Sequence, residues 1–197
     1  MSAPVGRATV LPRPRIILPP AWELFPVTDD NAATARTAFS GAWESGPRDS
    51  IGPFVHELER ALAAVLDDAR GAGGFAAALP MGIPWQVPVS TAVVLSHVPA
   101  DDPQLPPGGE QVQTDAGPAR RGIHDIAPPT GGDAESVVLL RTIDYVWRVP
   151  GHDAHLVAFA SISGLAVPEY APVTEALTLL VTTMLDALTW PDSEGER

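Results

Sequence analysis

A chain of 197 residues is long enough for one domain with its own hydrophobic core, without support from metals or disulfides. It contains no cysteine and no lysine, which excludes disulfides, cysteine nucleophiles, Schiff-base lysines and lysine-based phosphate loops. The formal net charge of −12 argues against a nucleic-acid partner, because phosphate backbones are bound by clustered basic side chains.

The chain also lacks the sequence signals of membrane insertion and export. No segment approaches the roughly 20 apolar residues of a transmembrane helix. Residues 1–20 contain three arginines but no continuous apolar run of the kind found in signal peptides. We therefore expect a cytoplasmic protein that is not inserted in a membrane.

The N-terminal part predicts an extended segment and two helices. Residues 1–13 are expected to form a flexible tail, and the proline-punctuated apolar segment 21–27 to lie across the core as an extended lid. A first helix is expected to begin near Thr28 and end before Gly46. A second is expected over residues 50–71, since its apolar residues recur at helical spacing. These residues, expected to cover one face of a sheet, are Ile51, Phe54, Val55, Leu58, Leu62, Val65 and Leu66.

The remainder predicts six strands and a C-terminal helix. The strands are expected over residues 74–79, 89–98, 110–114, 118–124, 135–149 and 154–163, and the helix over residues 171–188. Apolar residues on both faces of residues 135–149 predict a central strand covered on two sides.

These elements together predict an α+β fold with a mainly antiparallel sheet, because most strands are neighbours in sequence. Two N-terminal helices and one C-terminal helix on opposite faces would give a three-layer α/β/α sandwich. The single domain is expected to span residues 14–190, followed by a flexible acidic tail at 191–197.

The densest group of metal-ligand residue types is His152-Asp153-Ala154-His155, in the expected turn between the last two strands. These histidines could share a metal ion with Asp153, or with His124 and Asp125 from another loop. A polar turn is the simpler interpretation, because the spacing fixes no third ligand and such residues are ordinary in turns. The sequence therefore predicts no metal and no cofactor, with these five residues as the alternative.

No catalytic constellation is recognisable, and no catalytic residue is predicted. The segment Ser161-Ile162-Ser163-Gly164 lacks the pattern of a nucleophile elbow. Asp144, inside the expected central strand, is predicted to form an ion pair with Arg120 or Arg121. Whether the chain is an enzyme stays open, with the balance against it.

Four aromatic residues lie in or beside proline-rich segments: Trp22, Phe25, Trp43 and Trp85. Such residues either close the ends of a sandwich or form an exposed patch that binds a partner. The second interpretation makes them candidates for partner binding.

Several short segments resemble a group of small actinobacterial proteins of unknown function, whose layout is similar to the Mog1/PsbP-like α/β/α sandwich. These segments are Leu18-Pro19-Pro20-Ala21-Trp22, Ala116-Gly117-Pro118-Ala119-Arg120, Val149-Pro150-Gly151 and the stretch from Leu180 to Trp190. The chain departs from that pattern in the polar loop 99–109 and at Ser161–Gly164, where a Thr-Pro pair is often found. The resemblance implies a fold whose members are mostly non-catalytic binding or accessory proteins, and it implies no active-site residue.

The sequence thus leads to a non-catalytic cytoplasmic accessory protein that binds another protein, as an adaptor or chaperone does. One alternative is a small-ligand or metal-binding protein, or an enzyme, with a pocket near His124 and His152. A second alternative is a structural subunit of a homo-oligomer.

Overall fold

The computed structural model describes residues 11–44, 48–82, 88–100, 102, 104–127 and 136–191. Most of the two expected tails and the candidate residue Trp85 lie outside this part of the chain. In chain order the elements are β1 (Trp22–Pro26), α1 (Asn31–Ala38), the 3-10 helix η1 (Ser40–Glu44), α2 (Arg48–Gly71), β2 (Gly74–Pro80), β3 (Ser90–Pro99), β4 (Glu110–Thr114), β5 (Gly117–Asp125), β6 (Val137–Arg148), β7 (Ala154–Leu165), the 3-10 helix η2 (Pro168–Tyr170) and α3 (Ala171–Asp186).

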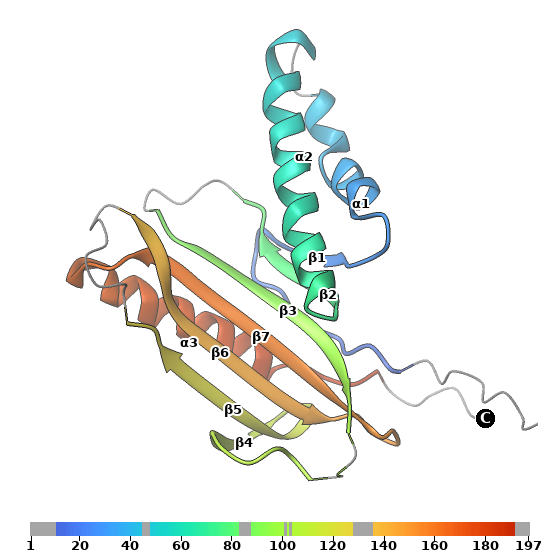
Figure 1. Ribbon diagram of the computed structural model, residues 1–197, viewed down its shortest axis with the longest axis vertical. Coiled ribbons are helices and arrows are strands. Elements are labelled where there is room, and N and C mark those ends of the chain that lie inside the picture. The colour runs from blue at the N-terminus through green and yellow to red at the C-terminus, as the bar shows by residue number, and fades with distance from the viewer. Residues whose placement is uncertain are drawn as a thin grey trace, which may run out of the picture.

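The strands form one seven-stranded antiparallel sheet with the order β1-β2-β3-β7-β6-β5-β4 (Figure 1). Over the described residues the fold is therefore α+β, as the sequence predicted. Neighbours in sequence pair within β1–β3 and within β4–β7. The two groups are joined where β3 pairs with β7, from Ser90 opposite Ser163 to Pro99 opposite Ala154.

Helix α3 covers one face of the sheet and closes the main core. Alternate residues of β7, such as Leu156 and Ile162, point to this face because successive strand residues project to opposite sides. They pack with the buried α3 residues Val181 and Leu185. Pro172 lies in the first turn of α3, where its missing N–H has no intrahelical partner to lose.

Among the described helices, α1 and α2 lie on the other face of the sheet, over β1 and β2. A second, smaller core joins Phe25 of β1 and Ala77 of β2 to Ala35 of α1 and to Leu62 and Leu66 in the C-terminal half of α2. At about 1.5 Å per residue, the 24 residues of α2 span about 36 Å. The N-terminal half of this helix extends beyond the sheet (Figure 1).

The expected three-layer sandwich is consequently not confirmed, since in the described part of the chain helices cover β7 and β6 on one face alone. β6 does lie inside the sheet, between β5 and β7, as its apolar composition predicted. Among the described helices, none is long and apolar enough to cross a membrane.

The segment expected to form a lid is instead the edge strand β1. It pairs with β2 from Trp22 opposite Pro80 to Pro26 opposite Ala76. An edge strand tolerates its proline, because one side of the strand needs no ladder partner. Trp22 and Phe25 are core residues, with 7% and 5% of their surface exposed, so for these two the alternative of an exposed patch is wrong.

Candidate functional site

The sheet face opposite α3, from β3 across β7 and β6 to β5, is named here the open face. Its exposed apolar side chains include Phe159 at the centre and Val98 near one end, which are 46% and 45% exposed. Leu139 and Val137 lie towards the other end of β6 and are also exposed. A soluble domain normally buries side chains of this size against another layer, so the open face is a candidate contact surface.

A charged cluster interrupts the apolar side chains of the open face. Asp144 Oδ2 accepts a hydrogen bond from Arg120 Nη2 at 2.6 Å, which confirms the predicted ion pair. Asp144 Oδ1 lies 3.1 Å from His124 Nε2. Gly122 separates Arg120 and His124 on β5, and a Cβ there would lie 2.4 Å from Asp144 Oδ1. Glycine at this position therefore makes the cluster possible.

Helix α2 carries a second uncovered apolar surface, which we call the α2 stripe: Phe54, Leu58, Ala61 and Val65. Residues at this spacing lie on one side of a helix. Phe54 is 64% and Val65 41% exposed, while Leu58 is half-buried. The stripe therefore presents apolar surface along most of the helix, including the half that extends beyond the sheet.

The contacts of α2 show which way the stripe points. Leu62 and Leu66 pack towards β2. On one flank of the row formed by Leu62 and Leu66, Asp67 accepts a hydrogen bond from Asn31 of α1 at 2.9 Å. On the same flank, the His56 ring contacts the Trp43 ring, with centroids 5.0 Å apart. Successive helical residues are about 100° apart, which places the stripe on the opposite flank.

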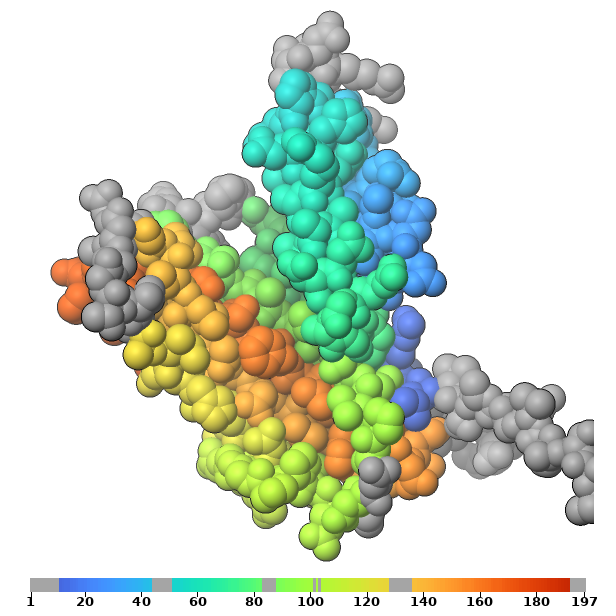
Figure 2. Space-filling model, in the orientation of Figure 1, coloured from blue at the N-terminus to red at the C-terminus, as the bar shows by residue number. Residues whose placement is uncertain are grey.

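The flank of α2 that carries the stripe lies towards the open face. Helix α1 lies beside β1, because Phe25 of β1 packs against Ala35 of α1. In the sheet, β2 separates the edge strand β1 from β3. The flank away from α1 is consequently the flank nearer β3 and β7. Figure 2 shows α2 rising from the sheet, so that the helix and the open face meet at an angle.

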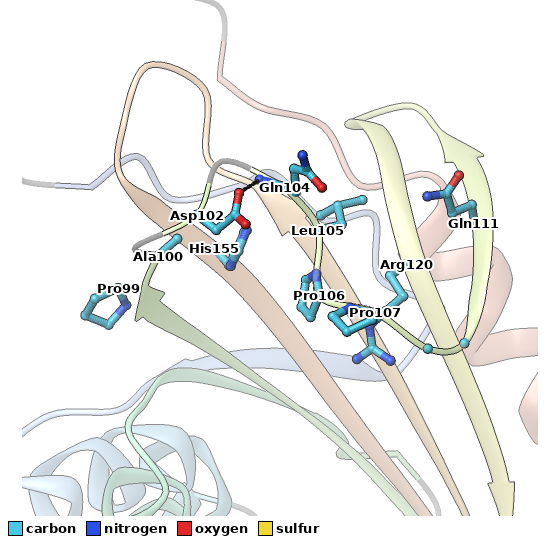
Figure 3. Close-up of a pocket in the computed structure, with 12 residues that line it drawn as sticks. Pro99, Ala100, Asp102, Gln104, Leu105, Pro106, Pro107, Gln111, Arg120 and His155 are labelled. Carbon is cyan, nitrogen blue, oxygen red and sulfur yellow. Dashed lines mark hydrogen bonds between the residues drawn. The ribbon is translucent and has the colours of Figure 1, made fainter.

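A pocket of about 840 Å³ lies at the end of the open face nearest the β6–β7 turn (Figure 3). The segment 104–109 forms one wall through Leu105, Pro106 and Pro107, and Arg120 and His155 come from the sheet. Arg148, the cross-strand neighbour of His155, donates a hydrogen bond to the backbone oxygen of Asp102 at 3.3 Å.

Two nitrogens at this pocket are buried without a hydrogen-bond partner in the described structure: Arg120 Nε and His155 Nε2. His155 is only 9% exposed. A buried donor or acceptor left unpaired costs about 1–3 kcal/mol. Such groups are uncommon enough that a pair of them beside one pocket marks it as a candidate ligand site.

The five candidate metal ligands do not converge. His124 and Asp125 lie at the end of β5, opposite Thr142 and Arg141 near the beginning of β6. His152 and Asp153 lie in the turn after the other end of β6, and His155 is opposite Arg148. A pocket shared by His124 and His152 is therefore not formed. Within the described ranges, no three His, Asp or Glu residues are placed to hold a metal ion.

Four members of that set, all except His155, have an ordinary structural contact, and that of His124 with Asp144 is given above. Asp125 accepts a hydrogen bond from Arg141 at 2.7 Å, and Asp153 accepts one from Arg148 at 2.8 Å. His152 Nδ1 lies 2.7 Å from the carbonyl oxygen of Pro150, to which it donates when protonated there. The polar-turn interpretation accounts for these contacts.

Trp43 is the remaining described aromatic candidate, and it is half-buried. Its indole N–H donates to Glu59 at 3.3 Å, and its ring lies 3.5 Å from the position a Cβ would take at Gly52. Trp43 thus holds η1 against the N-terminal half of α2. Its role is to support the stripe-bearing helix from the flank opposite the stripe.

Tyr145 and His97 are among the titratable groups outside these surfaces whose pKa values are shifted. Burial raises the pKa of Tyr145 to about 12, and its hydroxyl donates to Asp186 at 2.9 Å. Burial also lowers the pKa of His97, whose ring stacks on Phe75 with centroids 4.5 Å apart. Both groups support the packing on the α3 side and at the β3 end of the sheet.

Comparisons of this chain with models of protein families, with curated proteins and with solved structures found no match.

Proposed function

We propose that this protein is a non-catalytic accessory protein that binds another protein through the α2 stripe and the adjoining open face. The observation that carries the proposal is the pair of exposed apolar surfaces meeting at an angle. Phe54 and Val65 on the helix and Phe159 on the sheet are each more than 40% exposed. Burial of apolar surface contributes about 25 cal/mol per Å², so a partner that fills this angle gains most of its binding energy there.

The partner's chemistry follows from the charges beside the stripe. Glu57 and Asp68 are exposed on α2 and border the solvent side of the stripe. Neither carboxylate forms an ion pair within the described part of the chain, and the whole chain has a net charge of −12. An amphipathic helix with an apolar face and a flanking row of Lys or Arg complements both features.

The long α2 suits this role because its N-terminal half has no sheet beneath it. That half is supported by η1 through Trp43, which leaves Phe54 and Leu58 available to a partner helix. Partner helices of this kind are bound through side chains at i, i+3 or i+4, and i+7. The spacing of the stripe offers a matching row.

The test is photo-crosslinking at defined positions in extracts of the native host. A benzoyl-phenylalanine at position 54 is expected to capture one protein through an apolar helical segment flanked by basic residues, identified by mass spectrometry. Position 179 is the matched control, because Leu179 on α3 is also apolar, helical and 68% exposed. Equal capture at both positions, or none at position 54, would refute the proposal.

Variants then connect capture to the surface. Phe54→Asp with Val65→Asp should abolish capture, whereas Leu179→Asp should not, and surface changes of this kind alter folding stability by only about 0.5 kcal/mol. Glu57→Gln with Asp68→Asn should weaken capture and reduce its salt dependence. If the captured protein is a second copy of this chain, the homo-oligomer interpretation replaces the accessory one.

A further inference from the structure

We propose that the pocket between segment 104–109 and the sheet binds a small uncharged amide, a molecule with carbonyl acceptors and an N–H donor. This site lies at the end of the open face and uses none of the exposed apolar side chains on which the protein-binding surface proposed above depends. It rests on the hydrogen-bonding groups that the pocket leaves unused and on the balance of charge around them.

The unused groups require a ligand that accepts hydrogen bonds. A guanidinium N–H can only donate, so Arg120 Nε needs an acceptor. His155 Nε2 also donates, and so also needs an acceptor, whenever it carries the ring proton. Val146 of β6 lies between Arg120 of β5 and Val157 of β7, since it is the direct cross-strand partner of both. His155 lies two residues from Val157 along β7 and therefore on the same side of the sheet. The two donors therefore flank one buried apolar residue, Val146, and one ligand with two acceptors can bridge them.

The charges favour a neutral ligand over an anion. Arg120 already shares its charge with Asp144 at 2.6 Å. Among the described residues that line the pocket, the other charged side chain is the carboxylate of Asp102. A carboxylate or phosphate ligand would meet no uncompensated positive charge, and two acidic groups would lie nearby. A carbonyl oxygen accepts the same hydrogen bonds without that repulsion.

The acidic group supplies the complementary half of the recognition. Asp102 Oδ1 accepts a hydrogen bond from the backbone N–H of Gln104 at 2.8 Å. Its second oxygen has no donor among the described residues and can accept from a ligand N–H. Leu105, Pro106 and Pro107 provide an apolar wall for the body of the ligand. Since Arg120 Nε and His155 Nε2 lie beneath the surface, binding must be accompanied by a shift of segment 104–109.

The probe is uracil, a cyclic amide with two carbonyls, titrated into isotope-labelled protein and followed by NMR. We expect saturable shifts of the Arg120 Nε–H and His155 ring signals and of the backbone amides of 104–111, with a Kd of about 1 mM or tighter. Orotate, the same ring with a carboxylate, should bind more weakly. N-acetylglycinamide distinguishes a free heterocycle from a peptide backbone as the source of the amide.

Two substitutions of His155 separate recognition from structure. His155→Phe removes the donor and should weaken uracil binding about three- to tenfold, the worth of one hydrogen bond. His155→Gln places an amide N–H near the former Nε2 and should retain binding. His56→Phe, an exposed position on α2 away from the pocket, is the control and should leave binding unchanged.

The proposal is overturned if about 10 mM uracil shifts neither Arg120 nor His155 in the wild-type protein. It is also overturned if orotate binds more tightly than uracil, because the charge argument then fails. Both measurements use the unaltered chain, so they decide the matter even if a His155 variant does not fold.

Discussion

Adding one methyl group at Gly122 is expected to break the Arg120–Asp144–His124 cluster. A Cβ at residue 122 would lie 2.4 Å from Asp144 Oδ1 and 2.7 Å from His124 Nε2. His124 is exposed and can swing away at little cost. Asp144 cannot, because its short side chain is held by Arg120 at 2.6 Å and both of these side chains are 18% exposed.

The size of the effect follows from two opposing contributions. Forcing an extra methyl group into a packed site costs about 1–3 kcal/mol. Replacing glycine by alanine where the backbone permits it raises the free energy of unfolding by about 0.4–1 kcal/mol, because it restricts the unfolded chain. The φ angle of Gly122 lies outside the positive region, so this stabilisation applies here. We expect Gly122→Ala to lower the free energy of unfolding by about 1–2 kcal/mol.

Urea denaturation at neutral pH measures this change, and a double-mutant cycle assigns its cause. In an Asp144→Ala background the carboxylate is gone, so the same Gly122→Ala substitution should cost less than half as much. Gly71→Ala is the matched control, because nothing lies within 4 Å of the added Cβ at the end of α2. That variant should be as stable as the wild type or more stable by up to about 1 kcal/mol.

The reasoning is refuted if Gly122→Ala is as stable as the wild type. It is refuted equally if the loss of stability is unchanged when Asp144 is alanine, because the cost would then come from the strand backbone.

Three further predictions concern the buried side of the sheet. Because burial raises the pKa of Tyr145 to about 12, above the unfolded value of about 10, its contribution to stability is complete below pH 10 and is lost as the pH rises towards 12. Tyrosinate absorbance of a Tyr170→Phe variant, which leaves one tyrosine, should titrate near pH 12 and not near 10. Burial lowers the pKa of His97, so its contribution to stability is complete above about pH 6.5, the ordinary pKa of a histidine, and is lost as the pH falls. The ring-proton NMR signals of this histidine should titrate below that ordinary value. Trp147 is fully buried and its indole N–H donates to Thr114 at 3.0 Å. Trp147→Phe should therefore lower the free energy of unfolding, measured by urea denaturation, by about 1–3 kcal/mol. A smaller decrease would show that the indole does not support the core.

Local patterns predicted the elements of this fold well where one periodicity dominates. The strand over residues 110–114 has the predicted bounds, and the C-terminal helix begins at Ala171, where Pro172 requires it. The strand containing Asp144 was predicted to be internal, and its ion pair with Arg120 followed from the same reasoning.

Relations between distant elements were not predictable in this way. The pairing of β3 with β7 depends on how two groups of strands meet, which no local pattern records. Segment 21–27 was misinterpreted because its prolines suggested a lid, although an edge strand tolerates proline equally well.

The sequence did contain a signal for the α2 stripe, and we missed it. The apolar residues that were expected to be buried, from Ile51 to Leu66, span an arc of about 120° at 100° per residue, which is wider than the contact that Leu62 and Leu66 make with the sheet. We interpreted the whole arc as buried, whereas the structure uses Leu62 and Leu66 for packing and leaves Phe54 and Val65 exposed. The pocket beneath segment 104–109 had no comparable signal, because it depends on where a proline-rich loop comes to lie.

The long-range pairings of the sheet have a consequence for how the chain folds. The strand pairs β2–β3, β4–β5, β5–β6 and β6–β7 are close in sequence, so each can assemble quickly, whereas β1 reaches β2 only after α1 and α2. The β3–β7 ladder must bring together residues from distant parts of the chain, and the entropy of closing that loop is lost before its contacts form. We therefore expect formation of the β3–β7 ladder to set the folding rate, with substitutions in the ladder slowing refolding more than substitutions in the α2 stripe.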